Sequence, residues 1–512
     1  MVSQPVSTRF LRPLRRALFG CLVTGVLPGL IITGLIPGLG HGPRLEAQEE
    51  SDYYRRVSFE VPEAHYLEVG GMTLTPNGSL MVCTRRGDVV RIDDPDGPPE
   101  EMTYSLFASG LQSPLGIVEL DGSYYVAQLG ELTRLSDTDG DGEADRFDTV
   151  CDDWGFSGNF HEFAYGPRLD REGFLWVTLN VPFGEEPYKP NPWRGWALRI
   201  DPRTGEMFPM AAGLRSPSGL EISPDGDVFF TDNQGNWCNA NKLAHIERGD
   251  FHGHPFSLRS VRDPLSPVED HGPPPDRLYM KDVAKEMPSF KMPAVWFPFR
   301  KAGRGPAGMA WDTTGGKFGP FEGQVFVTEF RMSRVFRVQL EKVRGHWQGA
   351  VYPFITGLKS AGVRALFSPK GNLLVGQTRR GWGSIGPKQY ALERVDWTGR
   401  TPFEIRTIHA RADGFELEFT LPIDLTNGTQ ATSYRLESYT YRLSETYGGP
   451  EEDKRTHVIE AVEPGPEGKK VFLPIRDLRP GYVYEFHVPG LRSADGTAIL
   501  HDTAFYTLVN LP

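Results

Sequence analysis

Cysteine is scarce in this chain, which has four cysteines among 512 residues. Removal of the N-terminal segment described below would leave Cys83, Cys151 and Cys238, and an odd number leaves one thiol unpaired even if one disulfide forms. The fold is therefore not a small scaffold held together by disulfides. The pattern Cys-x-x-Cys-His does not occur in the sequence, which excludes a covalently attached c-type haem.

The chain also lacks an excess of positive charge, since its formal net charge is −11 at pH 7. Nucleic acid is therefore not expected as a general partner, because phosphate binding requires a positive face. The sequence contains no Gly-x-Ser-x-Gly, no Walker loop and no His-Glu-x-x-His. These absences argue against serine hydrolases of the α/β type, P-loop nucleotide enzymes and zincin proteases.

The uncharged run that is long enough to cross a membrane lies near the N-terminus, where residues 17–40 carry no charge. Arg12, Arg15 and Arg16 precede this run, and the small residues Gly42 and Ala47 follow it. This pattern predicts a signal peptide over residues 1–48, with Ala47 at the cleavage position. The mature protein is then secreted or periplasmic, without a membrane span. The alternative is an uncleaved anchor, because the run is just long enough to cross a bilayer.

Glycine and proline are abundant, at 58 and 43 residues, and they separate short apolar runs. One pattern recurs: a turn, an apolar strand, a Pro-Asp-Gly or similar turn, a second apolar strand, a polar loop and a third strand. Six copies begin at Gly71, Ser113, His161, Ser216, Gly305 and Gly362. Their spacing, roughly 40 to 50 residues where no insertion intervenes, is typical of propeller blades. The sequence therefore predicts a six-bladed β-propeller over residues 57–398.

The repeat stops near residue 398, and a different pattern follows. Residues 415–420 and 482–488 alternate apolar and polar side chains, as half-buried strands do. We expect residues 402–512 to form a β-sandwich of the immunoglobulin or fibronectin type III kind, which makes the whole chain all-β. We also expect residues 49–400 to fold without this sandwich.

Alignment of the six copies selects candidate site residues, because equivalent loops of a propeller open on one face around its axis. The positions just before the innermost strands are Gln112, His161, Arg215, Arg304 and Arg364. The loops after the second strands contribute Arg85, Arg86, Gln128, Asn180, Asp232, Asn233, Asn236, Glu329, Arg331, Gln377, Arg379 and Arg380. So many arginines favour an anionic ligand. The alternative is that they form ion pairs with surface acids.

A separate acidic loop has the ligand spacing of an EF-hand. Asp137, Asp139, Asp141, Asp145 and Asp148 occupy loop positions one, three, five, nine and twelve, and Gly142 occupies position six. Flanking helices are not expected, so the pattern predicts a hairpin loop that binds Ca²⁺. The alternative is a solvated acidic turn.

Five segments resemble a known family: residues 158–167 (GNFHEFAYGP), 213–220 (GLRSPSGL), 249–255 (GDFHGHP), 326–331 (FVTEFR) and 363–369 (VRALFSP). Across residues 57–396 the chain resembles the soluble quinoprotein glucose/sorbosone dehydrogenases. More closely it resembles large secreted propeller proteins of planctomycete type. The resemblance implies a six-bladed propeller that binds pyrroloquinoline quinone (PQQ) and Ca²⁺.

Carried over by position, the resemblance implies that His161 is the general base. It implies that Arg215, Arg331 and Arg364 lie near the quinone, and we add Asp232, Asn233 and Gln128 as further cofactor-binding candidates. The chain departs from the family where acidic residues bind the active-site Ca²⁺, because Asn239 and Ala240 stand there instead.

These observations lead to one main hypothesis and two alternatives. The main hypothesis is an exported oxidoreductase that acts on a sugar or polyol with a quinone cofactor and passes electrons to a cytochrome c. The first alternative is a non-catalytic propeller that binds a carbohydrate or another small ligand. The second is a Ca²⁺-dependent hydrolase of the lactonase kind on the same fold.

Overall fold

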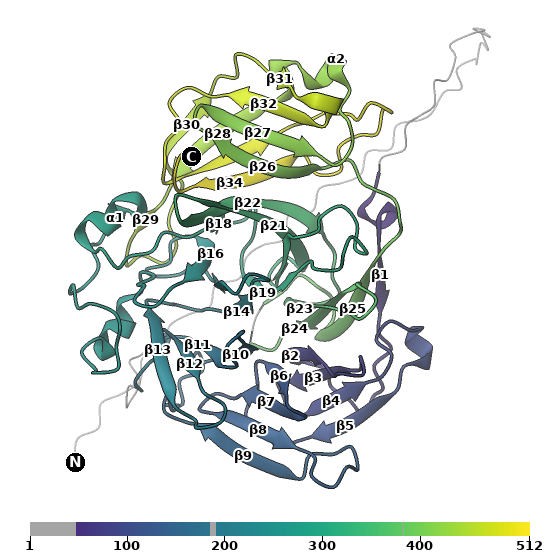
Figure 1. Cartoon of the computed structure of the whole chain (residues 1–512), viewed down its shortest axis with the longest axis vertical. Helices are drawn as coiled ribbons and strands as arrows, with labels where there is room; N and C mark the ends of the chain where they lie inside the picture. The colour runs from purple at the N-terminus through teal and green to yellow at the C-terminus, as the bar shows by residue number, and fades with distance from the viewer. Residues whose placement is uncertain (1–47, 185–190, 382) are drawn as a thin grey trace, which may run out of the picture. The chain divides into compact units, whose positions relative to one another are not determined.

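The computed structural model describes residues 48–184, 191–381 and 383–512, and within these residues the regular secondary structure consists almost entirely of antiparallel strands (Figure 1). The expected signal peptide lies outside the described residues except for Gln48. Six four-stranded units correspond to the six sequence repeats, which confirms the propeller. The first strands of these units contact one another in a closed cycle, as a ring of blades requires.

The first five blades each take their strands from one continuous stretch of chain. The first blade contains β2 (Val69–Leu74), β3 (Leu80–Thr84), β4 (Val89–Ile92) and β5 (Tyr104–Ala108), and the second contains β6 (Ile117–Leu120), β7 (Ser123–Ala127), β8 (Leu132–Ser136) and β9 (Arg146–Cys151). The third blade contains β10 (Ala164–Leu169), β11 (Leu175–Leu179), β12 (Trp196–Ile200) and β13 (Met207–Ala212), and the fourth contains β14 (Gly219–Ile222), β15 (Val228–Asp232), β16 (Asn241–Ile246) and β18 (Val295–Phe297). The fifth blade contains β19 (Pro306–Trp311), β20 (Val325–Glu329), β21 (Arg334–Val343) and β22 (His346–Ile355).

Glycine in the innermost strands allows neighbouring blades to approach closely at the axis. A Cβ on Gly116 would lie 1.8 Å from the carbonyl oxygen of Gly166, and one on Gly219 would lie 2.0 Å from that of Ala307. Such contacts are too short for any side chain. The glycine that recurs in the sequence pattern therefore has a packing role in closing the ring.

The sixth blade combines the two ends of the propeller segment. Strands β23 (Gly362–Phe367), β24 (Leu373–Thr378) and β25 (Tyr390–Trp397) are completed by the N-terminal strand β1 (Tyr54–Ser58). β1 pairs antiparallel with β25, with Tyr54 opposite Trp397. This strand closes the ring by hydrogen bonds, and it starts before residue 57, where we expected the propeller to begin.

Two further sheets form the C-terminal sandwich. One contains β26 (Ile405–Arg411), β27 (Gly414–Phe419), β32 (Lys470–Pro474) and β31 (Glu463–Pro464); the other contains β34 (Thr503–Leu508), β33 (Tyr482–His487), β28 (Arg435–Thr440) and β30 (Glu452–His457). The ring of Phe415 packs against those of Tyr484, Phe486 and Tyr506 across the two sheets. Aromatic side chains thus dominate the core of the sandwich.

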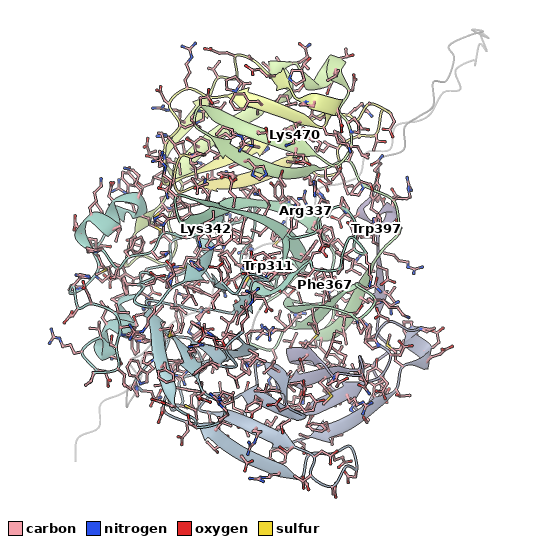
Figure 2. All side chains as sticks on the ribbon, viewed as in Figure 1. Trp311, Arg337, Lys342, Phe367, Trp397 and Lys470 are labelled. Carbon is pink, nitrogen blue, oxygen red and sulfur yellow. The ribbon has the colours of Figure 1, made fainter. Side chains whose placement is uncertain are left out.

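The sandwich is joined to the propeller by hydrogen bonds as well as by the chain. β22 of the fifth blade pairs with β34, so the blade and one sandwich sheet form a single eight-stranded sheet. Arg337 on β21 is fully buried beside the sandwich and donates to the carbonyl oxygen of Arg406 at 3.2 Å (Figure 2). The long insertion in the fourth blade also reaches the sandwich, through pairing of β17 (Leu278–Tyr279) with β29 (Arg442–Leu443).

The remaining elements of the described residues are short. They are the helices α1 (Met280–Glu286) and α2 (Leu425–Gly428), and the 3-10 turns η1 (Glu50–Asp52), η2 (Pro99–Glu101), η3 (Pro255–Ser260), η4 (Ala431–Ser433) and η5 (Pro466–Gly468). None of the helices in the described part of the chain has the length and apolar character that a membrane crossing requires.

Candidate functional site

One pocket gathers side chains from five blades and from the sandwich. Its volume is about 470 Å³. The lining residues are Arg85, Phe160, His161, Phe163, Phe183, Arg215, Ser216, Asn233, Gln234, Arg304, Phe330, Arg380, Gly381 and Tyr447. Most of them lie just before a first strand or just after a second strand. The repeat alignment selected six of them, and we call this cavity the mouth pocket.

Two loops of the third blade hold His161, one before its first strand and one after its second strand. Its Nδ1 lies 2.7 Å from the carbonyl oxygen of Val181, and its backbone N–H donates to Oδ1 of Asn159 at 3.0 Å. A carbonyl oxygen only accepts, so Nδ1 carries the proton and Nε2 keeps its lone pair. Burial, helped by the charge of Arg215, lowers the pKa of His161 to about 4. The imidazole is therefore a neutral base at physiological pH.

Arg215 presents a guanidinium to the same pocket. Its Nε donates to Oδ1 of Asn236 at 3.2 Å, and its carbon Cζ lies 5.7 Å from the ring centre of Phe183. The loop that carries it is fixed by Asp232, whose carboxylate accepts the backbone N–H groups of Arg215 at 3.0 Å and Ser216 at 2.6 Å. Asp232 therefore positions the arginine and does not itself line the pocket.

The mouth pocket is rich in arginine, and one of these arginines, Arg380, pairs with Glu68 at 3.1 Å. Arg85, Arg215, Arg304 and Arg380 line it, and no carboxylate occurs among the described residues of its wall. Arg85 is anchored by bonds from Nη1 to the carbonyl oxygen of Arg380 at 2.9 Å and from Nε to Oγ of Ser113 at 3.1 Å. Fixed guanidiniums beside aromatic rings suit a flat ligand that carries carboxylates.

The structure does not bring Arg364 into the mouth pocket, although the resemblance implied that it binds the quinone. Its Nη1 donates to the carbonyl oxygen of Ser218 at 3.0 Å, and its Nη2 donates to that of Leu115 at 2.7 Å. Burial lowers the pKa of Arg364 to about 10. The side chain thus links three blades near the axis, and its terminal nitrogens already have protein partners.

Arg331 and Gln128 also lie outside the residues that line the mouth pocket. The guanidinium of Arg331 packs so closely on Gly383 that a Cβ there would lie 2.0 Å from its Nη1. The amide of Gln128 donates to Oγ1 of Thr133 at 2.6 Å and to Oε1 of Glu131 at 3.0 Å, so it braces a turn of the second blade. Asn233 does line the pocket, and its amide donates to Oγ of Ser218 at 3.0 Å.

The residues present do not fit the Ca²⁺ ion that the resemblance implied for this site. Asn239 supplies no charge, and its side chain is bound to the backbone of a sandwich loop. Ala240 is buried and offers no side-chain oxygen. The carboxylate of Asp232 accepts hydrogen bonds from backbone N–H groups and lies 3.8 Å from Nζ of Lys242. A hard divalent cation requires more charged oxygen ligands than this.

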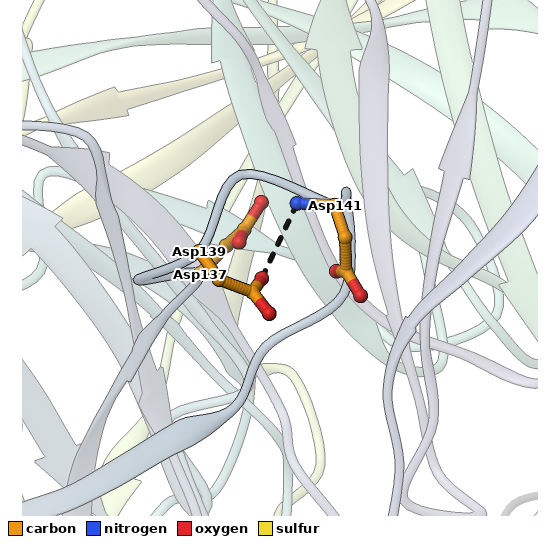
Figure 3. A group of neighbouring side chains, drawn as sticks. All are labelled: Asp137, Asp139 and Asp141. Atoms are coloured by element: carbon orange, nitrogen blue, oxygen red, sulfur yellow. Dashed lines mark hydrogen bonds between the residues drawn. The ribbon is translucent and has the colours of Figure 1, made fainter.

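The acidic loop of the second blade brings together three of its five aspartates. The carboxylates of Asp137, Asp139 and Asp141 lie within 4.8 Å of one another (Figure 3). Asp145 instead accepts the backbone N–H of Thr138 at 2.9 Å.

Asp148 does not join the three either. Its carboxylate pairs with Arg134 at 2.7 Å and with Arg146 at 2.9 Å. These two arginines lower the pKa of Asp148 through hydrogen bonds. The geometry therefore differs from the five-ligand loop that the spacing predicted.

Eight of the fourteen residues that line the mouth pocket were not selected from the sequence, among them the aromatic residues Phe160, Phe183 and Tyr447. Phe160 and Phe183 lie beside selected positions of the third blade, and their exposed fractions of 69 % and 40 % are high for phenylalanine. A search for aromatic residues next to the selected positions would have found them. Tyr447 lies in the sandwich, outside the repeat, so no alignment of blades could select it.

Comparison with known proteins gives one partial family match and several structural likenesses. A family model described as a domain of unknown function (DUF7133) matches residues 63–268. A search among curated proteins gives no significant match.

Three solved structures illustrate the structural likeness. An oxidoreductase of Thermus thermophilus described as a glucose dehydrogenase is 19 % identical, with a TM-score of 0.48, over 67 % of this chain and 99 % of that one. The PQQ-bound aldose sugar dehydrogenase of Streptomyces coelicolor is 16 % identical, with a TM-score of 0.45, over 67 % and 98 %. The apo form of the soluble aldose sugar dehydrogenase of Escherichia coli is 13 % identical, with a TM-score of 0.48, over 67 % and 99 %.

Proposed function

We propose that the protein is an exported oxidoreductase whose mouth pocket binds a flat, anionic quinone and oxidises a sugar or polyol. The observation that carries this proposal is the combination of four arginines and a neutral histidine in one pocket. Guanidinium groups bind carboxylates, and the aromatic walls accept a planar ring. The sequence resemblance to quinoprotein sugar dehydrogenases supports the same assignment, and PQQ has the required carboxylates and ring system.

The role of His161 follows from its tautomer and its low pKa. Nδ1–H is fixed on the carbonyl oxygen of Val181, so Nε2 takes the proton of the substrate hydroxyl. A bound quinone would supply the acceptor for the hydride, so that the alcohol becomes a carbonyl and the quinone becomes a quinol. Burial and Arg215 disfavour the imidazolium, and His161 therefore releases the proton readily after each turnover.

A second candidate is a propeller that binds a quinone, a carbohydrate or another small ligand without catalysis. The observation that favours it is the presence of Asn239 and Ala240 where the resemblance implies acidic Ca²⁺ ligands, because neither of these two described residues offers a charged oxygen. Without that ion, a bound quinone would be less electrophilic. Both candidates use the same pocket, and only the first predicts turnover.

One titration distinguishes the two candidates. Purified mature protein is titrated with PQQ, with and without Ca²⁺, while absorbance is recorded, and dye reduction is then followed with a panel of aldoses and polyols. Binding with dye reduction supports the oxidoreductase, and binding without reduction supports the second candidate. A lack of PQQ binding under both conditions would contradict the proposed cofactor.

The electron acceptor and the cellular location of the protein are separate proposals. A cytochrome c remains the proposed electron acceptor, and export remains proposed from the N-terminal segment. Cell fractionation with an antibody against the propeller would locate the protein, and N-terminal sequencing would show whether the chain starts at Gln48.

A further inference from the structure

A loop of the sandwich, residues 444–449, lies on the fourth blade at the edge of the mouth pocket. Asn239 holds this loop by three hydrogen bonds. Its Oδ1 accepts from the backbone N–H of Ser444 at 2.9 Å, its Nδ2 donates to the carbonyl oxygen of Thr446 at 3.2 Å, and its own carbonyl oxygen accepts from the N–H of Gly449 at 2.9 Å. Asn239 is itself 1 % exposed, so these bonds are shielded from water.

The backbone around Asn239 adds two further bonds to the same loop. The N–H of Trp237 donates to the carbonyl oxygen of Ser444 at 2.7 Å, and the N–H of Gly448 donates to that of Gly235 at 3.0 Å. A Cβ on Gly449 would lie 3.0 Å from Cβ of Asn239, so the two chains are in close contact. The loop is therefore fixed along most of its length rather than laid over the surface.

This attachment places Tyr447 in the wall of the mouth pocket. Its ring centre lies 5.2 Å from Cζ of Arg215 and 6.4 Å from the ring centre of Phe183. Arg215 is only 4 % exposed, whereas Tyr447 is 66 % exposed. The tyrosine thus covers the guanidinium and presents the rest of its ring to solvent. Small-molecule pockets are lined mainly by hydrophobic and aromatic side chains, and Tyr447 forms such a wall together with Phe183.

We propose that the sandwich is part of the binding site: Tyr447 contacts the ligand beside Arg215, and Asn239 is the positioning residue that keeps it there. The identity of the ligand as a planar anion rests on the function proposed above. The position at which the resemblance implied a Ca²⁺ ligand thus has a different role in this chain. It binds a second domain, and that domain supplies an aromatic wall in place of an ion.

The test uses the mature chain and four variants. Tyr447→Ala removes the ring, Tyr447→Phe keeps it, and Asn239→Ala releases the loop. Glu445→Ala is the matched control, because Glu445 lies in the same loop but does not line the mouth pocket. Three quantities are measured: the dissociation constant for PQQ, the melting temperature, and the rate at which phenylglyoxal modifies Arg215, as located by peptide mass spectrometry.

We expect Tyr447→Ala to weaken PQQ binding about five- to tenfold, the usual effect of one lost aromatic contact. Modification of Arg215 should become faster, while the melting temperature stays unchanged because the ring is mostly exposed. Asn239→Ala should shift binding and labelling in the same direction. Tyr447→Phe and Glu445→Ala should behave as the wild type does.

The outcomes separate this proposal from the proposed function. If PQQ binds equally well to the wild type and to Tyr447→Ala, the role of Tyr447 is refuted and the quinone site stands. If PQQ does not bind to the wild type, the quinone is refuted, and the rate of Arg215 modification then tests whether Tyr447 forms part of the pocket wall. Faster modification of Arg215 in Tyr447→Ala then still supports a pocket wall supplied by the sandwich, and an unchanged rate refutes it.

Discussion

His161 combines a fixed Nδ1–H with a pKa of about 4, so its base form dominates from mildly acidic pH upwards. If the protein is an oxidoreductase, His161→Gln should lower kcat by about two to four orders of magnitude, the range for a lost general base. The melting temperature should barely change, because glutamine can still donate to Val181. Dye reduction under saturating sugar and PQQ measures the effect.

The pH profile of the wild type provides the control for His161. A base with a pKa near 4 loses activity only as pH falls through about 4, whereas an ordinary histidine would lose it near 6.5. The acid limb of kcat/KM should therefore lie well below pH 6. An acid limb centred near pH 6.5 would show that burial does not lower the pKa of His161.

Arg364 leads to the opposite expectation, a loss of stability. Its guanidinium satisfies carbonyl oxygens of Leu115 and Ser218 from two other blades. Arg364→Met leaves these buried acceptors without partners, and we expect the free energy of unfolding to fall by about 2 to 4 kcal/mol. Chemical denaturation measures this change.

The matched control for Arg364 is Arg55→Met, because the side chain of Arg55 is 71 % exposed. It should change stability by less than about 0.5 kcal/mol. If Arg364→Met instead left stability intact and weakened PQQ binding alone, the side chain would belong to the ligand site after all.

At the scale of single elements, the hairpin of β8 and β9 carries the acidic loop. Three clustered carboxylates would bind Ca²⁺, and binding to the folded state alone raises stability by about 2.7 kcal/mol at a hundredfold excess over Kd. We expect Ca²⁺ to raise the melting temperature and Asp139→Asn to remove the rise. The replacement keeps the Oδ1 that accepts from the N–H of Asp141. Calorimetry with Ca²⁺ and with a chelator measures the effect.

Asp148 provides the control for the loop, because its carboxylate faces Arg134 and Arg146 instead of the cluster. Asp148→Asn should lower the melting temperature slightly, and equally with Ca²⁺ and with chelator. If the wild type itself melts at one temperature in both conditions, the loop is a solvated acidic turn.

The elements themselves were largely predictable, because each repeat encodes its strands locally. The turn at Asp225-Gly226 shows why: Gly226 has φ +98°, which glycine adopts readily, and its N–H donates to the carbonyl oxygen of Ser223 at 2.9 Å. Turn residues between apolar runs therefore mark the strand ends. The partner of β25 was not predictable, because β1 lies more than three hundred residues away in the chain.

At the scale of the whole molecule, His501 joins the sandwich to the 3-10 turn η1 that precedes strand β1. Its Nδ1 lies 2.6 Å from Oε1 of Glu404, and its Nε2 lies 3.4 Å from Oε1 of Glu50. Burial opposes a charge on the ring, but the two carboxylates outweigh it and raise the pKa of His501 to about 9. The imidazolium is therefore the bound form at neutral pH.

This raised pKa predicts an alkaline loss of stability. The unfolded chain binds the proton with a pKa near 6.5, so the stabilisation is complete below about pH 6.5 and disappears as pH rises through about 9. We expect the free energy of unfolding to fall by about 3 kcal/mol across this window. His501→Gln should be less stable at pH 6 and should show a flatter profile. Identical slopes for both proteins would contradict the prediction.

The contacts between sandwich and propeller also bear on the fragment of residues 49–400. We expect it to fold, because six blades close the ring through β1 and β25 without the sandwich. It should nevertheless melt at a lower temperature, since Arg337 loses its partners Arg406 and Glu404. It should also self-associate, because β22 becomes an unpaired edge strand.

Calorimetry and size-exclusion chromatography of this fragment measure both effects. Non-cooperative unfolding would show that the propeller depends on the sandwich for its fold. A monomer with the melting temperature of the full chain would show that the contacts of β34 and Arg337 contribute nothing to stability.

The sequence by itself determined the number of blades and the set of loops that meet around the axis, because every repeat carries the same local order of strands and turns. It also placed His161 and Arg215 in the mouth pocket, since the repeat register decides the face on which a loop opens. Only the tertiary structure decided that the guanidinium of Arg364 donates its hydrogen bonds to backbone carbonyl oxygens and that Asn239 holds the loop of Tyr447. Such roles depend on which distant backbone atoms approach a side chain, and no local pattern encodes that distance.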